Sequence, residues 1–79
     1  MTEEQAFGIV LRKYRKQLGI SQEELAFRCE LDRSFISLLE RGIQSPSMKV
    51  VSKLAIELGV RASTMISEAE VLFEDSKNN

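Results

Sequence analysis

The sequence predicts an all-α domain of five short helices, and three observations support this. Apolar residues recur every three or four positions along most of the chain, as they do on one face of a helix. Residues that begin and end helices punctuate these segments. No segment shows the strict alternation of a half-buried strand. Because the chain has 79 residues, we expect one domain with one modest core.

Capping residues define the first two helices. Thr2 and Gln5 have capping-box spacing, so a helix begins near residue 3. Gly19 is suited to a left-handed helix end. Ser21 and Glu24 repeat the spacing and open a second helix over residues 22–29. The expected inward residues are Phe7, Val10, Leu11, Tyr14 and Leu18 in the first helix, and Leu25, Ala26 and Cys29 in the second.

The third helix follows after a very short turn. Asp32 is a good N-cap for it, and the helix ends at Gly42. Ile36 and Leu39 lie three positions apart and face the core, so the remaining side chains face largely outward. Residues 42–47 then form a loop rich in turn formers, whose Pro46 lies beside the start of the fourth helix.

Two more helices complete the domain. The fourth ends at Gly59, and its apolar stripe consists of Met48, Val51, Leu54, Ala55 and Leu58. The fifth begins near Ser63 and carries Met65, Ile66, Ala69, Leu72 and Phe73. We expect the domain to span residues 1–74 and the tail over residues 75–79 to fray, because this tail has nothing to bury.

Composition excludes several functions. The chain has no His, which removes His-based catalysis and most zinc sites, and its single Cys, Cys29, forms no internal disulfide. Residues 1–4 are acidic where a signal peptide is basic, and no apolar run approaches the roughly 20 residues of a membrane span. We therefore expect a cytoplasmic protein that is not an enzyme, with no cofactor, metal, small-molecule ligand or membrane partner.

The net charge of −1 argues against a strongly basic nucleic-acid-binding protein, but the charge is unevenly distributed. Residues 12–53 hold nine basic and five acidic side chains, a net charge of +4. Residues 54–79 have a net charge of −3, and residues 1–11 contribute −2. The middle of the chain is therefore mildly basic, and the C-terminal helix is acidic.

Residues 21–42 form two short helices joined by a tight turn, the second with a polar outer face. An α-helix fits the major groove of DNA, where each base pair presents a distinct hydrogen-bonding pattern. Helix pairs of this kind also serve as core scaffolding, so the spacing alone leaves both interpretations open.

The sequence resembles the XRE (Cro/cI-type) family of helix-turn-helix regulators over roughly residues 7–66. The matching stretches are Ser21-Gln22-Glu23-Glu24-Leu25-Ala26, Leu31-Asp32-Arg33-Ser34-Phe35-Ile36-Ser37, Glu40-Arg41-Gly42 and Leu54-Ala55-Ile56-Glu57-Leu58-Gly59-Val60. The resemblance implies a phage-repressor-like domain whose third helix enters the major groove.

The resemblance also assigns site residues. Base-facing positions are Arg33, Ser34, Phe35, Ser37 and Leu38, of which Arg33 suits guanine best. Phosphate-contacting positions are Gln22, Arg41, Gln44, Ser45 and Lys49. For each arginine and serine the alternative is an ordinary solvated side chain. Arg15 matches a scaffold position that pairs with Glu40.

Two positions depart from the family pattern. Glu30 stands in the turn where the family usually has Gly, so a left-handed backbone there costs about 1 kcal/mol. Phe35 stands where relatives often carry Tyr, which removes a hydroxyl contact to phosphate.

The fifth helix indicates a homodimer. Its stripe of Met65, Ile66, Ala69, Leu72 and Phe73 is long enough to leave a patch for a second copy, although it could also simply complete a monomer core. The sequence thus predicts a dimeric regulator that binds palindromic double-stranded DNA, resembling the controller proteins of restriction–modification systems. The alternative is a protein-interaction module of the same fold, such as an antitoxin.

Overall fold

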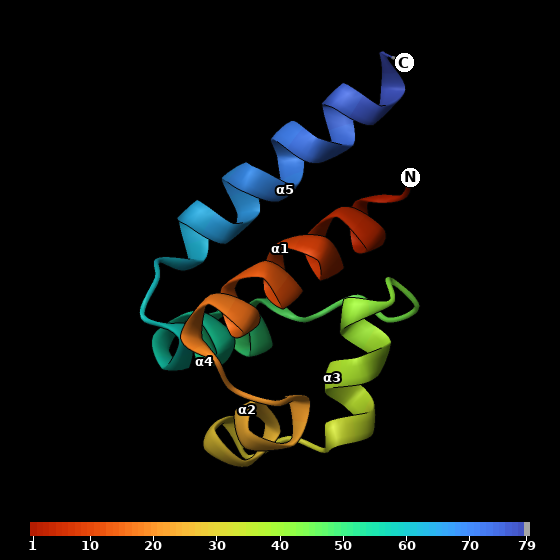
Figure 1. Ribbon diagram of the computed structural model, residues 1–79. Helices are drawn as coiled ribbons and strands as arrows, with labels where there is room; N and C mark the ends of the chain where they lie inside the picture. Colours follow the sequence, from red (N-terminus) through yellow and green to blue (C-terminus); the bar gives the residue numbers. More distant parts are fainter. Residues whose placement is uncertain (79) are drawn as a thin grey trace.

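A computed structural model describes residues 1–78 of the chain, and within them the expected all-α fold is confirmed. The five helices are α1 (Glu3–Leu18), α2 (Gln22–Cys29), α3 (Arg33–Glu40), α4 (Met48–Leu58) and α5 (Ala62–Lys77). In Figure 1, α1 and α5 lie side by side along the upper part of the molecule, and α2 and α3 form its lower end. The start of α1 and the last turn of α5 both lie toward the upper right of this view. The turn between α2 and α3 is therefore at the end of the molecule remote from α5, whereas the C-terminal end of α3 reaches the first turn of α1.

Local capping explains most helix boundaries. Thr2 and Gln5 form a complete capping box at the start of α1, and Gly19 ends that helix with φ of 75°. The hydroxyl of Ser21 accepts a hydrogen bond from the Glu24 amide and so caps α2. The expected role of Asp32 is only half right: it occupies the N-cap position of α3, but its side chain makes no capping hydrogen bond. The start of α3 thus depends on packing more than on its cap.

The core gathers residues from all five helices. The largest side chains with less than 2% exposure are Leu11, Leu25, Ile36, Leu39, Leu54, Met65 and Val10. Two residues expected in the core are outside it: Met48 is 89% exposed and Leu18 is 45% exposed. Both residues lie in a terminal turn of their helix. The apolar spacing directs their side chains toward the side of the core, but no neighbouring helix covers them there.

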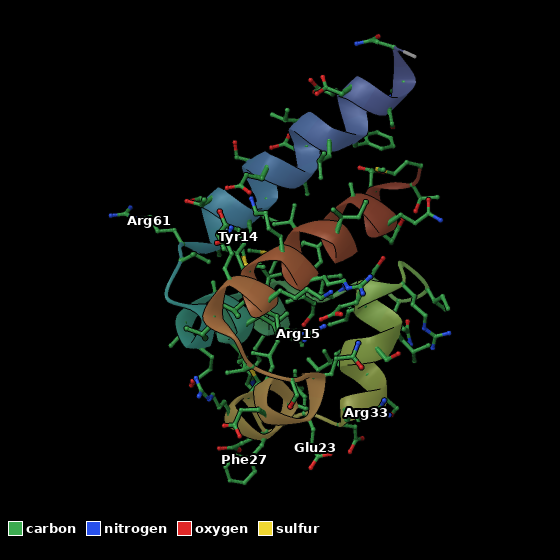
Figure 2. The ribbon with its side chains drawn as sticks, in the orientation of Figure 1. Tyr14, Arg15, Glu23, Phe27, Arg33 and Arg61 are labelled. Atoms are coloured by element: carbon green, nitrogen blue, oxygen red, sulfur yellow. The ribbon has the colours of Figure 1, made fainter. Side chains whose placement is uncertain are left out.

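A polar cluster fixes α5 against α1. The Lys13 ammonium and the Tyr14 hydroxyl both donate to the Glu68 carboxylate, and the ammonium lies 4.5 Å from the centre of the Tyr14 ring. In Figure 2, Tyr14 points from α1 toward the beginning of α5. Hydrogen bonds from Lys13 and Tyr14 lower the pKa of Glu68. The first helix is therefore tied to the last by charge as well as by apolar packing.

The C-terminal helix is longer than the sequence predicted. It begins at Ala62 and continues to Lys77, so residues 75–77 are helical rather than frayed. The Ser76 hydroxyl donates to the Phe73 carbonyl in this last stretch. Asn79, the last residue of the expected tail, lies outside the described residues. None of the helices in residues 1–78 has the length and apolar character that crossing a membrane requires.

The turn between α2 and α3 contains a left-handed non-glycine residue, as expected at Glu30. Its φ and ψ are 56° and 44°, and its amide donates to the Phe27 carbonyl. Glu30 is the only non-glycine residue with a positive φ among residues 1–78. The turn therefore adopts the backbone geometry that glycine favours without having glycine.

We predict that Glu30→Gly raises the free energy of unfolding by about 1 kcal/mol, because it relieves the left-handed strain. Urea titration followed by circular dichroism measures this change. Gly19→Ala is the matched control, because Gly19 has φ of 75° and an added Cβ would meet nothing within 4 Å. This control should lower the free energy of unfolding by about 1 kcal/mol. An unchanged or lower stability of Glu30→Gly contradicts the strain argument.

Glu68→Gln should destabilise the chain at neutral pH, and its effect should vanish in acid. The pKa of Glu68 is lowered in the folded state, so its contribution is complete above the unfolded pKa of about 4.3 and is lost as pH falls below that value. Thermal unfolding of both proteins between pH 7 and pH 3 measures the difference. Glu74→Gln, at an exposed position of the same helix, is the control. A difference that persists at pH 3 would show that the mutation acts through packing.

Candidate nucleic-acid interface

The position of α3 is set by its inner face. Ile36 and Leu39 are fully buried, and Leu25 and Ala26 of α2 are buried on the facing side, all as predicted. The C-terminal end of α3 also approaches α1 very closely at Gly8. A Cβ on Gly8 would lie 2.5 Å from the backbone oxygens of both Leu39 and Glu40. Close packing on two helices therefore fixes which side of α3 faces solvent.

The outer face of α3 carries most of the predicted base-facing residues. Arg33 and Ser34 are exposed, and Ser37 and Leu38 are half-buried. Figure 2 shows Arg33 at the lower end of α3, directed away from the bundle. Phe35 differs from these residues, because its half-buried ring packs against the core. The free surface of α3 thus consists mainly of one guanidinium, two hydroxyls and one leucine.

A buried ion pair anchors the end of α3. Arg15 donates through Nε to Glu40 Oε2 at 2.6 Å and through a terminal nitrogen to Glu40 Oε1 at 2.9 Å. Its other terminal nitrogen donates to the Ile20 carbonyl at 2.9 Å. The Glu40 side chain is 4% exposed and that of Arg15 is 11% exposed. The hydrogen bonds to Glu40 raise the pKa of Arg15. The predicted scaffold pairing of Arg15 with Glu40 is confirmed.

The same carboxylate also holds Gln22, the first residue of α2. The Gln22 amide nitrogen donates to Glu40 Oε1 at 3.0 Å. One acid therefore joins α1, α2 and the end of α3. No sequence pattern indicated this contact, because Gln22 and Glu40 are 18 positions apart and belong to different helices.

The remaining predicted phosphate-contacting residues are in two situations. Arg41, Gln44 and Lys49 are exposed around the loop that precedes α4. Ser45 is exposed too, but its hydroxyl donates to the Glu4 carboxylate at 2.9 Å. The pKa of Glu4 is lowered by its own backbone amide and then by this hydroxyl. A carboxylate beside Ser45 disfavours an anion there, so Ser45 is a weaker candidate than its three neighbours. No sequence pattern indicated the contact between Glu4 and Ser45, which are 41 positions apart.

The predicted dimer stripe on α5 divides between core and surface. Met65 has no exposed surface and Ala69 is 8% exposed, so Met65 is wrong as an interface residue and belongs to the core. Their side chains fill the space between α5 and the rest of the bundle. Ile66 is 43% exposed, and Leu72 and Phe73 are half-buried. Only part of the stripe is thus available to a second molecule.

An apolar groove lies beside the exposed part of this stripe. It has a volume of about 370 Å³, and the apolar side chains along it include Phe7, Val51, Ala62, Ile66, Ala69 and Phe73. Met48, the residue expected in the core, lines its edge from the first turn of α4. Glu3, Glu4 and Glu70 also line the groove. Met48, which the sequence predicted in the core, is therefore a surface residue at the edge of an apolar groove. The sequence did not reveal this groove.

Cys29 belongs to the core, as expected. It is 3% exposed, and its Sγ lies 3.8 Å from the Lys53 carbonyl. Burial raises the pKa of its thiol, which favours the unreactive protonated form.

Residues 11–64 match the family described as Helix-turn-helix. Control protein C.BamHI from Bacillus amyloliquefaciens is 38% identical over 61 residues, which cover 76% of this chain and 75% of the relative.

Solved structures of regulators share the fold. The restriction–modification controller protein C.AhdI from Aeromonas hydrophila matches with a TM-score of 0.76 at 39% identity, over 78% of this chain and 94% of that one. The clp gene regulator ClgR from C. glutamicum matches with a TM-score of 0.84 at 27% identity, over 89% of this chain and 90% of that one.

Proposed function

The chain belongs to the helix-turn-helix family of DNA-binding transcriptional regulators, and we propose that it acts as a homodimer that binds a palindromic operator in the cytoplasm. The family is one of regulators and not of enzymes. The similarity of this chain to C.BamHI and C.AhdI supports a more specific assignment as the controller of a restriction–modification system.

The contrast between the two faces of α3 is the observation that carries the proposal. Ile36 and Leu39 hold one face in the core, while Arg33 extends from the other into solvent. An exposed guanidinium at the start of such a helix is suited to donate two hydrogen bonds to guanine O6 and N7. Ser34, Ser37 and Leu38 supply further contacts to base edges and thymine methyl groups. Around this face, we expect phosphate contacts from Gln22, Arg41, Gln44 and Lys49, with a lesser contribution from Ser45.

The apolar groove supports the homodimer. The exposed Met48 side chain lies at the edge of this groove. In a dimer with a two-fold axis, each copy would place its Met48 against the groove of the other copy. Ile66, Leu72 and Phe73 complete the contact, and Ala69 contributes its small exposed surface. Such a dimer would present two copies of α3 about 34 Å apart, one turn of DNA.

The same groove favours one second candidate function. An apolar groove bordered by carboxylates also suits a helix of a different protein with an apolar face and basic flanks, as in an antitoxin that binds a toxin. The outer face of α3 distinguishes the two functions, since only the DNA-binding regulator requires Arg33.

Arg33→Ala should weaken binding to the operator by about 1–3 kcal/mol per half-site and relax the preference at one base pair. The operator is first obtained by selection of tight binders from random duplexes with the unaltered chain. Affinities are then measured by fluorescence anisotropy at two salt concentrations.

Arg61→Ala is the matched control, because Arg61 is exposed at the start of α5 and points away from the bundle on the side remote from Arg33. It should leave both affinity and base preference unchanged. If Arg33→Ala instead binds the selected duplex as tightly as the unaltered chain, α3 does not read the bases and the interaction module becomes the better assignment.

Met48→Glu and Ile66→Glu should each weaken self-association at least tenfold, because each places a charge in the proposed apolar contact. Sedimentation velocity over a range of concentrations measures the dimer Kd. Ile56→Glu is the control, because Ile56 lies on α4 like Met48 and is 76% exposed but does not line the groove. Variants that remain dimeric would place the interface elsewhere, and a monomeric unaltered chain would exclude the homodimer.

A further inference from the structure

We propose that Glu40 is a positioning residue for DNA binding, which orients the Gln22 amide toward a phosphate at the start of α2. This inference rests on the proposed function and deepens it. It assigns to the buried Arg15–Glu40 pair a second role besides holding helices together. The observation behind it is that Glu40 Oε1 accepts from both Arg15 and Gln22, at 2.9 and 3.0 Å.

The geometry leaves one donor of Gln22 available. A primary amide nitrogen carries two N–H groups, and Gln22 uses one of them for Glu40. The second N–H stays free at the half-buried edge of the helix start. Of the first backbone N–H groups of α2, that of Glu24 donates to the Ser21 hydroxyl, whereas those of Gln22 and Glu23 have no acceptor within the helix and favour an anion at the same end. A phosphate there would meet the side-chain and backbone donors together.

The carboxylate is itself held rigidly, which makes it an effective support. Its side chain is 4% exposed, and Arg15 binds both of its oxygens. A free glutamine loses several rotatable bonds of freedom when it binds a ligand. Because Glu40 already restricts Gln22, that loss occurs on folding rather than on binding DNA. Glu40 is also the last residue of α3, so the phosphate contact and the base-reading helix share one fixed point.

A mutant cycle on the selected operator duplex tests this inference. Two backgrounds remove the buried charges: Arg15→Met with Glu40→Gln retains an acceptor for Gln22, and Arg15→Met with Glu40→Leu does not. Replacement of both members of a buried pair preserves folding better than loss of one. Gln22→Ala is introduced into each background and into the unaltered chain, and the affinities for the duplex are measured.

We expect Gln22→Ala to weaken binding about tenfold in the unaltered chain and in the Gln background, as for loss of one hydrogen bond to a charged group. In the Leu background the effect should fall below twofold. The dependence of affinity on salt should not change with Gln22→Ala, because a neutral side chain releases no counterions, whereas Lys49→Ala should reduce its slope by about 0.9.

Equal effects of Gln22→Ala in all three backgrounds would overturn the positioning role, and no effect in the unaltered chain would overturn the phosphate contact as well. Neither result bears on base reading by α3 or on dimer formation, which the Arg33→Ala, Met48→Glu and Ile66→Glu variants test separately.

If the Leu background does not fold, side-chain amide relaxation by NMR gives the answer in the unaltered chain. The Gln22 amide should be ordered like the backbone, with an order parameter near ~0.85, and the exposed Gln17 amide should be below ~0.6. Equal disorder of the two amides would overturn the inference.

Discussion

The bidentate ion pair between Arg15 and Glu40 determines how the helix-turn-helix is held on the rest of the domain. It connects the last turn of α1 to the end of α3, and through Gln22 to the start of α2. Loss of one partner from such a buried pair costs about 3–5 kcal/mol, because the other charge is left without compensation. In residues 1–78, no buried side-chain nitrogen or oxygen lacks a hydrogen-bond partner. Both members of the ion pair thus have their hydrogen-bond partners. The geometry of these bonds fixes the orientation of α1, α2 and α3 relative to one another.

Apolar packing alone would not fix that angle as sharply. Ile36 and Leu39 hold α3 against the core, but aliphatic side chains tolerate small rotations of a helix about its contact. Two additional constraints act at the C-terminal end of α3: the directional hydrogen bonds of Glu40, and the close backbone approach at Gly8. Together they place the outward face of α3 in one orientation, which sequence-specific contact with bases requires.

The sequence predicted the elements well because helix boundaries are local. Thr2, Ser21, Gly19 and the left-handed Glu30 all act within a few residues, and each adopts the expected geometry. The Arg15–Glu40 pair was predicted only through the family resemblance. The prediction failed where burial depends on distant segments: Met48 has the right spacing for the core, yet no helix covers it. The Gln22–Glu40 and Ser45–Glu4 contacts join residues far apart in the chain, so no spacing rule could find them.

The carboxylate of Glu4, held beside Ser45, affects how the protein searches a genome. Sequence-independent attraction to DNA grows with the number of phosphates that cationic side chains neutralise. The chain has a net charge of −1, and Glu4 brings a negative charge beside Ser45 in the loop that precedes α4. We therefore expect short residence on random DNA, so that few molecules are sequestered by the many competing sites of a chromosome. On the proposed function, a small number of copies per cell would then fill one operator, and occupancy would respond quickly when synthesis of the protein starts or stops.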